Sequence, residues 1–281
     1  MTDGARPYKV AVPTGIEQVT IMFHAGAFVL LSLLPFTSPS ASGSQDPAPT
    51  PADKRPEVAT LLDKLKDHAG KAGKEDKDAV AVIDQLNQEF KNSGPKDKAL
   101  IVKGISHCFE ERRLEKEGQP PDNQLYLAAA VALGEMGPDS TAALISWIGQ
   151  KDLRKDNAVQ HRLILSLGKT KDKKAIKTLT MNLDNKTSSL IGAAAEALGE
   201  FNEVDLDTRK DMFESLLKTL MSAKGAKDMN VNDTTAREKY DVIAAPIITS
   251  LGKLSKHDER DPDKWLNWWN KNKKADWDAQ Q

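Results

Sequence analysis

From residue 57 onward, apolar residues recur at intervals of three and four, which is the spacing of one face of an α-helix. The alternation typical of strands is almost absent. Helix stop and start signals, such as residues 137–140 (GPDS) and 205–208 (DLDT), separate the apolar stripes. The pattern therefore predicts an all-α fold. The stripes comprise Val58, Leu61, Leu62 and Leu65; Ala79, Val82, Ile83, Leu86 and Phe90; Leu125, Ala128, Ala129, Ala132 and Leu133; Ile191, Ala194, Ala195 and Leu198; Phe213, Leu216, Leu217 and Leu220; and Ala244, Ile247, Ile248 and Leu251.

A short motif, Ala or Ser followed by Leu-Gly and a charged residue, ends four of the predicted helices. Its glycines are separated by 34, 31 and 53 residues, and an interval of 30 to 34 residues accommodates two short helices and two turns. We expect each glycine to adopt a positive φ and to close the last turn of its helix. The alanines should let neighbouring helices approach closely. The glycines are Gly134, Gly168, Gly199 and Gly252, and a fainter copy places Gly104 30 residues before Gly134.

These motifs resemble the HEAT-repeat family, including its short bacterial form related to phycobilisome-lyase repeats. The resemblance is clearest in AAAVALGEMGPDSTAALISWI and SSLIGAAAEALGEF. It implies a right-handed α-solenoid of HEAT-like helical hairpins that binds proteins along its concave face. The first helices of the hairpins would line one face and the second helices the other. Because no repeat can bury its stripe alone, stacking of the repeats supplies the core.

The N-terminal part of the chain predicts export. Residues 23–36 (FHAGAFVLLSLLPF) form an apolar run that is shorter than the roughly 20 residues of a spanning helix. Small residues follow, with Ala41 and Gly43 spaced as a cleavage site requires. We expect a cleaved signal peptide, with Met22 as an alternative start, and a periplasmic or extracellular protein without a stable membrane span after cleavage. An uncleaved membrane anchor and a cytosolic protein are the alternatives.

The composition divides the chain into four segments. Residues 1–44 form the signal peptide, and residues 45–56, with four prolines, form an extended linker. Residues 57–260 hold the helical repeats. Residues 261–281 form a tryptophan-rich capping helix.

Four of the five tryptophans lie in this last segment. Asp261 and Pro262 predict the start of a helix, on which Trp265, Trp268 and Trp269 share one face. We expect the rings to cover the last repeat, since terminal repeats need a cap for solubility. The alternative is an aromatic platform that binds a polysaccharide or a peptide.

The 53-residue interval contains a polar stretch, residues 222–235 (SAKGAKDMNVNDTT), which predicts a loop that protrudes from the array. Loops on a rigid scaffold often carry recognition. Lys227 and Asn230 in this stretch therefore join Trp265, Trp268 and Trp269 as candidate partner-binding residues. The alternative is a tolerated surface insertion.

The charged and reactive residues exclude several functions. Forty basic residues against forty-one acidic ones give a net charge of −1, which argues against nucleic-acid binding. The single cysteine, Cys108, excludes a disulfide scaffold, and it continues the apolar stripe of Ile101 and Ile105, so we expect it to be buried. The five histidines have no zinc-binding spacing. We therefore predict that the protein is not an enzyme and that it binds neither a cofactor nor a metal.

These observations favour a non-catalytic scaffold that mediates protein–protein interaction in the cell envelope or outside the cell, with a protein partner of unspecified identity. Two alternatives stay open. The resemblance also allows a bilin-lyase-like protein, and the tryptophan cluster allows a carbohydrate-binding protein.

Overall fold

The computed structural model describes residues 52–113, 122–230 and 232–279, which belong to one compact unit that begins at Ala48. The other unit, Met1–Pro47, lies outside the described residues, and so do the predicted signal peptide, Met22 and most of the predicted linker. Within the described ranges every regular element is helical, apart from an isolated bridge between Ala52 and Ser93. The predicted all-α class is confirmed.

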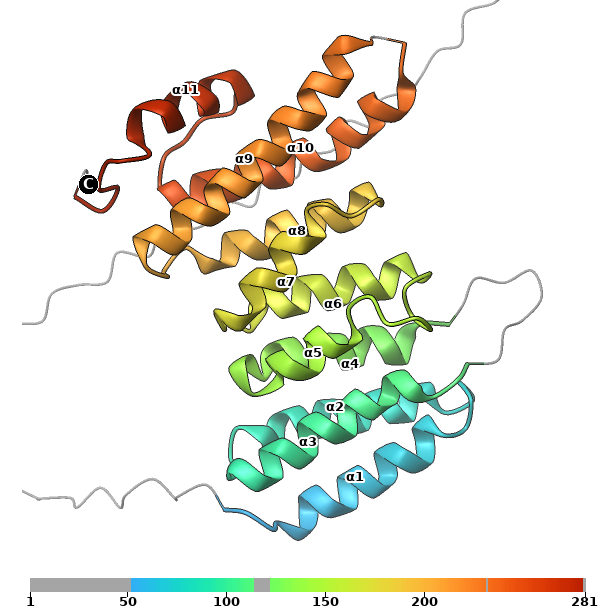
Figure 1. Ribbon diagram of the computed structural model, residues 1–281. Helices are drawn as coiled ribbons and strands as arrows, with labels where there is room; N and C mark the ends of the chain where they lie inside the picture. The colour runs from blue at the N-terminus through green and yellow to red at the C-terminus, as the bar shows by residue number, and fades with distance from the viewer. Residues whose placement is uncertain (1–51, 114–121, 231, 280–281) are drawn as a thin grey trace, which may run out of the picture. The chain divides into compact units, whose positions relative to one another are not determined.

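Eleven α-helices and three short 3-10 helices follow one another along the described residues (Figure 1). Two helix starts agree with the predicted signals, because Asp205 and Asp261 accept hydrogen bonds from the first-turn N–H groups of Thr208 and Asp263. The α-helices are α1 (Pro56–Ala69), α2 (Asp76–Phe90), α3 (Pro95–His107), α4 (Gln124–Glu135), α5 (Thr141–Trp147), α6 (Asn157–Lys169), α7 (Lys174–Asn182), α8 (Ser188–Leu198), α9 (Leu206–Met229), α10 (Thr234–Ser255) and α11 (Pro262–Asn272), and the 3-10 helices are η1 (Cys108–Glu110), η2 (Gly137–Ser140) and η3 (Gly199–Phe201).

The helices form an array of two layers. Consecutive helices pair as hairpins, from α1 with α2 to α9 with α10, and the hairpins stack in chain order (Figure 1). The odd-numbered helices α1, α3, α5, α7 and α9 form the first layer. The even-numbered helices α2, α4, α6, α8 and α10 form the second layer, and α11 packs against α9 at the end. The predicted solenoid of HEAT-like helical hairpins with a C-terminal capping helix is confirmed.

The glycines of the Leu-Gly motif set the spacing within the second layer. A Cβ built on Gly168 would lie 2.7 Å from the Cα of Ala197, closer than real Cβ atoms approach a backbone. Each of the first three glycines of the motif faces the small residue of the next motif, and we call these three contacts, which run from α4 to α10, the glycine ladder. In the other two contacts of the ladder, a Cβ built on Gly134 would lie 3.0 Å from the Cα of Ser166, and a Cβ built on Gly199 would lie 2.5 Å from the Oγ of Ser250.

The prediction that these glycines adopt a positive φ is wrong. Gly199, at the C-cap of α8, has φ −64°, and the other three glycines of the motif lie inside their helices. Among the described glycines, positive φ occurs at Gly73, Gly137 and Gly149. The motif requires glycine because a neighbouring helix approaches closely, and the turns are made elsewhere.

The predicted loop at residues 222–235 is also wrong, because most of it is helical. Helix α9 continues to Met229 and α10 begins at Thr234. Alanine and lysine are good helix formers, and Lys224 pairs with Asp228 one turn later at 2.9 Å. The stretch is polar because α9 and α10, with 24 and 22 residues, are much longer than α7 and α8, with 9 and 11.

The C-terminal cap is built around one ring, Phe213 of α9. Its centroid lies 5.1 to 5.6 Å from the rings of all four C-terminal tryptophans. Trp265 is fully buried and Trp277 nearly so. Aromatic pairs at such distances add to the stabilisation from burial. The rings that the sequence places on one face of α11 therefore close the end of the first layer.

A buried arginine of α9 holds the residues that follow α11. Arg209 of α9 is 2% exposed; its guanidinium donates to the carbonyl of Leu254 at 3.1 Å and pairs with the carboxylate of Asp278. Lys256 lies 3.4 Å from the other oxygen of that carboxylate. We call Arg209 and Asp278 the C-terminal clasp.

The chain before α1 is attached to the start of α3. The carbonyl of Ala52 accepts a hydrogen bond from the N–H of Gly94 at 2.9 Å. The buried carboxylate of Asp97 accepts the N–H groups of Lys54 and Arg55, both at 2.9 Å. The last residues of the segment predicted as a linker are thus held against α3, at the same end of the array as the start of α1.

Candidate functional site

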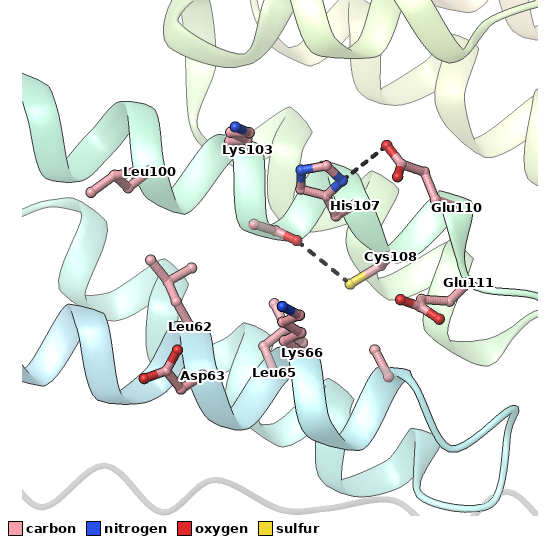
Figure 2. Close-up of a pocket in the computed structure, with 12 residues that line it drawn as sticks. Leu62, Asp63, Leu65, Lys66, Leu100, Lys103, His107, Cys108, Glu110 and Glu111 are labelled. Atoms are coloured by element: carbon pink, nitrogen blue, oxygen red, sulfur yellow. Dashed lines mark hydrogen bonds and ion pairs between the residues drawn. The ribbon is translucent and has the colours of Figure 1, made fainter.

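A groove of about 440 Å³ lies between α1 and α3, the first two helices of the first layer (Figure 2). The two helices run in the same direction. Leu62 of α1 lies against Gly104 of α3, and the carbonyl at the end of α1, on Ala69, accepts a hydrogen bond from Arg113, beyond the end of α3. One wall of the groove therefore comes from α1 and the other from α3 and η1.

The floor of the groove is apolar. Leu65, Ala69 and Cys108 are buried, and Leu62 leans over Gly104, where a Cβ would collide with it. At one end, the side chain of Leu100 remains 51% exposed. An apolar surface that is left open to water favours occupation by another apolar group.

The walls of the groove carry charges of both signs. Asp63 and Lys66 stand on α1, and Lys103 stands on α3, opposite α1 (Figure 2). None of these three side chains has an ion-pair partner within the described residues. Glu110 pairs with His107 at 2.9 Å, whereas the carboxylate of Glu111 is likewise unpaired in the described part of the chain.

A buried ion pair fixes one end of the groove. Arg113 lies 3.0 Å from Asp76 at the start of α2, and its guanidinium also donates to the carbonyl of Ala69 at 3.3 Å. Burial raises the pKa of Asp76, against the opposing charge of Arg113. The hydroxyl of Tyr126 in α4 donates to the carbonyl of Glu111. These contacts connect the end of α1, the start of α2 and α4 through the segment that follows η1.

Cys108 lies in the floor without the character of a nucleophile. Its side chain is buried as predicted, and burial raises the pKa of the thiol to about 12. The reactive form of cysteine is the thiolate, which is absent at neutral pH for such a group. The neighbouring His107 pairs with Glu110 instead.

The structure places the three predicted tryptophans together but gives them unequal exposure. Trp265 is fully buried, while Trp268 and Trp269 are partly buried against the core. The imidazole ring of His257 stacks on Trp268 with a centroid distance of 5.2 Å. The faces of these tryptophan rings are therefore engaged in contacts with other rings of the cap.

The two other predicted residues lie at the tip of the α9–α10 hairpin. The ammonium group of Lys227 lies 3.7 Å from the ring centroid of Tyr240, which holds this lysine against α10. Asn230 is the C-cap residue of α9, and its side-chain oxygen accepts a hydrogen bond from the N–H of Asn232. Both residues make contacts within the α9–α10 hairpin. They lie in a different part of the chain from the three tryptophans.

Three side chains near the α1–α2 turn could hold a metal ion, since ligand atoms of Asp67, His68 and Glu75 lie within 4.8 Å of one another. His68 is already 2.7 Å from Glu75, and Asp67 pairs with Lys71 at 2.9 Å. The hydrogen bond from Lys71 and its charge hold the pKa of Asp67 below its usual value. Asp67, His68 and Glu75 therefore already have ion-pair or hydrogen-bond partners within the protein.

A second, more open groove of about 310 Å³ lies on the other layer, between α2, α4 and α6. Leu127, Ala128 and Val131 of α4 line it, with Glu135 and Arg162 at its border. The carboxylate of Glu135 already accepts a hydrogen bond from Asn87 at 2.5 Å.

Sequence reasoning missed the α1–α3 groove. The signal that could have indicated it is Leu100, an apolar residue outside the buried positions Ile101 and Ile105 of its own helix. In the structure this residue lines the groove together with the apolar residues of its floor.

The architecture and the groove define the class: a helical-repeat protein in which stacked hairpins present extended surfaces. Comparison with known families agrees, because the family model described as HEAT repeats matches residues 114–199. The match covers α4 to α8, the middle of the array. A search of curated proteins found no match. No helix within the described ranges combines the length and apolarity needed to cross a membrane.

Proposed function

We propose that this chain is a non-catalytic scaffold that binds another protein in the α1–α3 groove. Protein interfaces have an apolar centre that loses its water and a polar rim. The groove has this arrangement, with the half-exposed Leu100 beside an apolar floor and unpaired charges on both walls. That arrangement is the observation that carries the proposal. The match to HEAT repeats supports it, since such repeats generally serve as protein-interaction scaffolds.

Two other functions fit the geometry less well. Binding of a polysaccharide by the C-terminal cap would require open ring faces, but Trp265 is fully buried, Trp269 stacks on Phe213 and Trp268 stacks on His257. Cys108 gives this chain no reactive thiol of its own to which a bilin could be attached, because it is buried and its pKa is raised. A bilin-lyase-like activity toward another protein would instead require a groove with polar side chains positioned for catalysis, and no arrangement of that kind is seen in the α1–α3 groove among the described residues.

We also propose that the protein acts in the periplasm or outside the cell. Residues 23–36 have the length and apolarity of a signal-peptide core, and small residues follow them. The mass of the protein isolated from its natural source tests this proposal. Loss of residues 1–44 would support export with cleavage, whereas an intact N-terminus in a cytosolic fraction would contradict it.

Photochemical crosslinking tests the binding function. A photoreactive amino acid at position 100 would contact a protein seated in the groove, and the same amino acid at position 181 serves as the matched control. Met181 is also apolar and exposed, at 66%, and lies on α7 of the same layer, outside the groove. We expect a discrete crosslinked protein, identified by mass spectrometry, from position 100 alone. Equal products from both positions, or none from position 100, would refute the proposal.

A further inference from the structure

The charges and dimensions of the α1–α3 groove specify what occupies it. We infer that the occupant is an amphipathic helix of the partner protein, about three turns long, lying antiparallel to α1 and α3. Its apolar stripe faces the floor, an acidic residue lies between Lys66 and Lys103, and a basic residue of its first turn faces Glu111. This inference rests on the proposed function and names the chemistry of the partner at the same site.

The shape of the groove fits a helix. Its walls are two helices that run in the same direction, and a helix laid along such a groove can place apolar residues every three or four positions on the floor. From Leu100 to Glu111 the wall is about 16 Å long, at 1.5 Å per residue. A helix of about three turns covers this length and presents three or four apolar side chains.

The charges of the groove fix the direction of that helix. Helices α1 and α3 both end beside Glu110 and Glu111, so the partial negative charges of two helix C-termini add to those of the carboxylates. Among the nearby cations, Lys71 and Arg113 are already paired with Asp67 and Asp76, whereas Arg112, which follows Glu111 in the chain, has no ion pair within the described residues. Arg112 does not line the groove, while Glu110 and Glu111 do. This end of the groove therefore favours the positive N-terminus of the bound helix.

The middle of the groove carries a net positive charge, because its walls hold two unpaired lysines, Lys66 and Lys103, and one unpaired carboxylate, Asp63, among the described residues. Lys66 and Lys103 stand on opposite walls, both are exposed, and neither has an acidic partner within the described ranges. A carboxylate on the bound helix would lie between the two ammonium groups. Complementary charges of this kind determine orientation and exclude wrong partners more than they raise affinity.

Two synthetic peptides test the inference. Both are fluorescein-labelled sixteen-residue helices with leucines at positions i, i+4 and i+7. One carries lysine in the first turn and glutamate in the middle, and the other has these charges exchanged. Fluorescence anisotropy with the full-length protein should show at least tenfold tighter binding of the first peptide. The double variant Lys66→Glu/Lys103→Glu should reverse the preference, while the control Lys177→Glu, an exposed lysine of α7, should keep it.

Each other outcome decides against the inference. Equal binding of both peptides, or tighter binding of the exchanged one, overturns the charge pattern. If neither peptide binds but a protein is crosslinked from position 100, the helix is refuted and the proposed function stands. If crosslinking fails as well, both fall. Sedimentation that shows a dimer lost in Leu100→Glu would place a second copy of this chain in the groove and overturn the inference.

Discussion

Replacing Gly168 with alanine would place a methyl group 2.7 Å from both the Cα and the Cβ of Ala197 in the neighbouring helix. No side-chain rotation can relieve this contact, because the groups that collide belong to the backbone or are fixed to it. Helices α6 and α8 must therefore move apart, which weakens their packing at the middle contact of the glycine ladder.

Two effects of opposite sign determine the magnitude. Alanine favours a helix over glycine by roughly 0.8–1 kcal/mol. Overpacking of a core costs typically about 1–3 kcal/mol, and a backbone contact belongs at the upper end of that range. The net result is a loss of about 1–2 kcal/mol. For a folded unit of this size, the melting temperature should fall by roughly 2–8 °C.

Gly225 supplies the matched control. It lies inside α9, exposed, and a Cβ built on it would meet no atom within 4 Å. Gly225→Ala should therefore gain the helix-propensity term alone and raise the melting temperature by a few degrees. Thermal unfolding followed by circular dichroism at 222 nm measures both variants. If Gly168→Ala stabilised the protein as much as Gly225→Ala does, the close-approach explanation of the motif would be refuted.

Three further predictions concern Leu198, the C-terminal clasp and Cys108. Leu198→Asp should put an unpaired charge into the fully buried seam of the array and lower the melting temperature by roughly 10 °C or more in one cooperative step, and an unchanged curve would contradict the stacking. Burial alone would raise the pKa of Asp278, but the hydrogen bond and charge of Arg209 outweigh it and hold the pKa below its usual value of 3.8. The carboxylate therefore contributes stability above pH 4, and this contribution is lost as the pH falls through the lowered pKa. On acidification, tryptophan fluorescence should therefore show that Trp277 becomes exposed to water. The variant Asp278→Asn should show the spectrum of exposed Trp277 already at pH 7. If this variant had the wild-type spectrum and the wild-type change on acidification, the role of the C-terminal clasp would be refuted. Finally, Cys108 should react with a thiol reagent only as fast as the protein unfolds, and rapid reaction of the folded protein would disprove its burial.

The fold could be predicted because burial in a two-layer array leaves a clear helical period. Leu125, Ala129 and Leu133 of one predicted stripe are all fully buried. The Leu-Gly motif also marked four helices of the second layer correctly. The role of its glycines could not be predicted, since a positive φ and a close helix contact both select glycine, and only the position of the neighbouring helix distinguishes them.

The length of α9 and α10, the longest hairpin, could not be predicted from the apolar pattern for a related reason. An apolar stripe records packing against neighbours, and it disappears where α9 and α10 extend past α7 and α8. Residues 222–229 therefore indicated a loop although they are helical. Their content of alanine and lysine carried the correct signal.

The candidate site could not be predicted because it joins residues far apart in the chain. Leu62 and Leu100 meet in one groove only when the first two hairpins stack. The cap shows the same limitation, since the four tryptophans were visible in the sequence but Phe213, the ring that gathers them, was assigned only to a buried stripe.

The affinity of the crosslinked partner for groove variants shows whether the α1–α3 groove is the binding site. Titration calorimetry would compare the full-length protein with Leu100→Glu and with Met181→Glu. Burying the open part of Leu100 is worth about 1 kcal/mol, and an ionised glutamate there loses more on desolvation than the roughly 1–3 kcal/mol of an uncharged polar group. We expect Leu100→Glu to weaken binding at least tenfold and Met181→Glu to leave it within twofold. Equal affinities of all three proteins would show that the α1–α3 groove does not bind the partner.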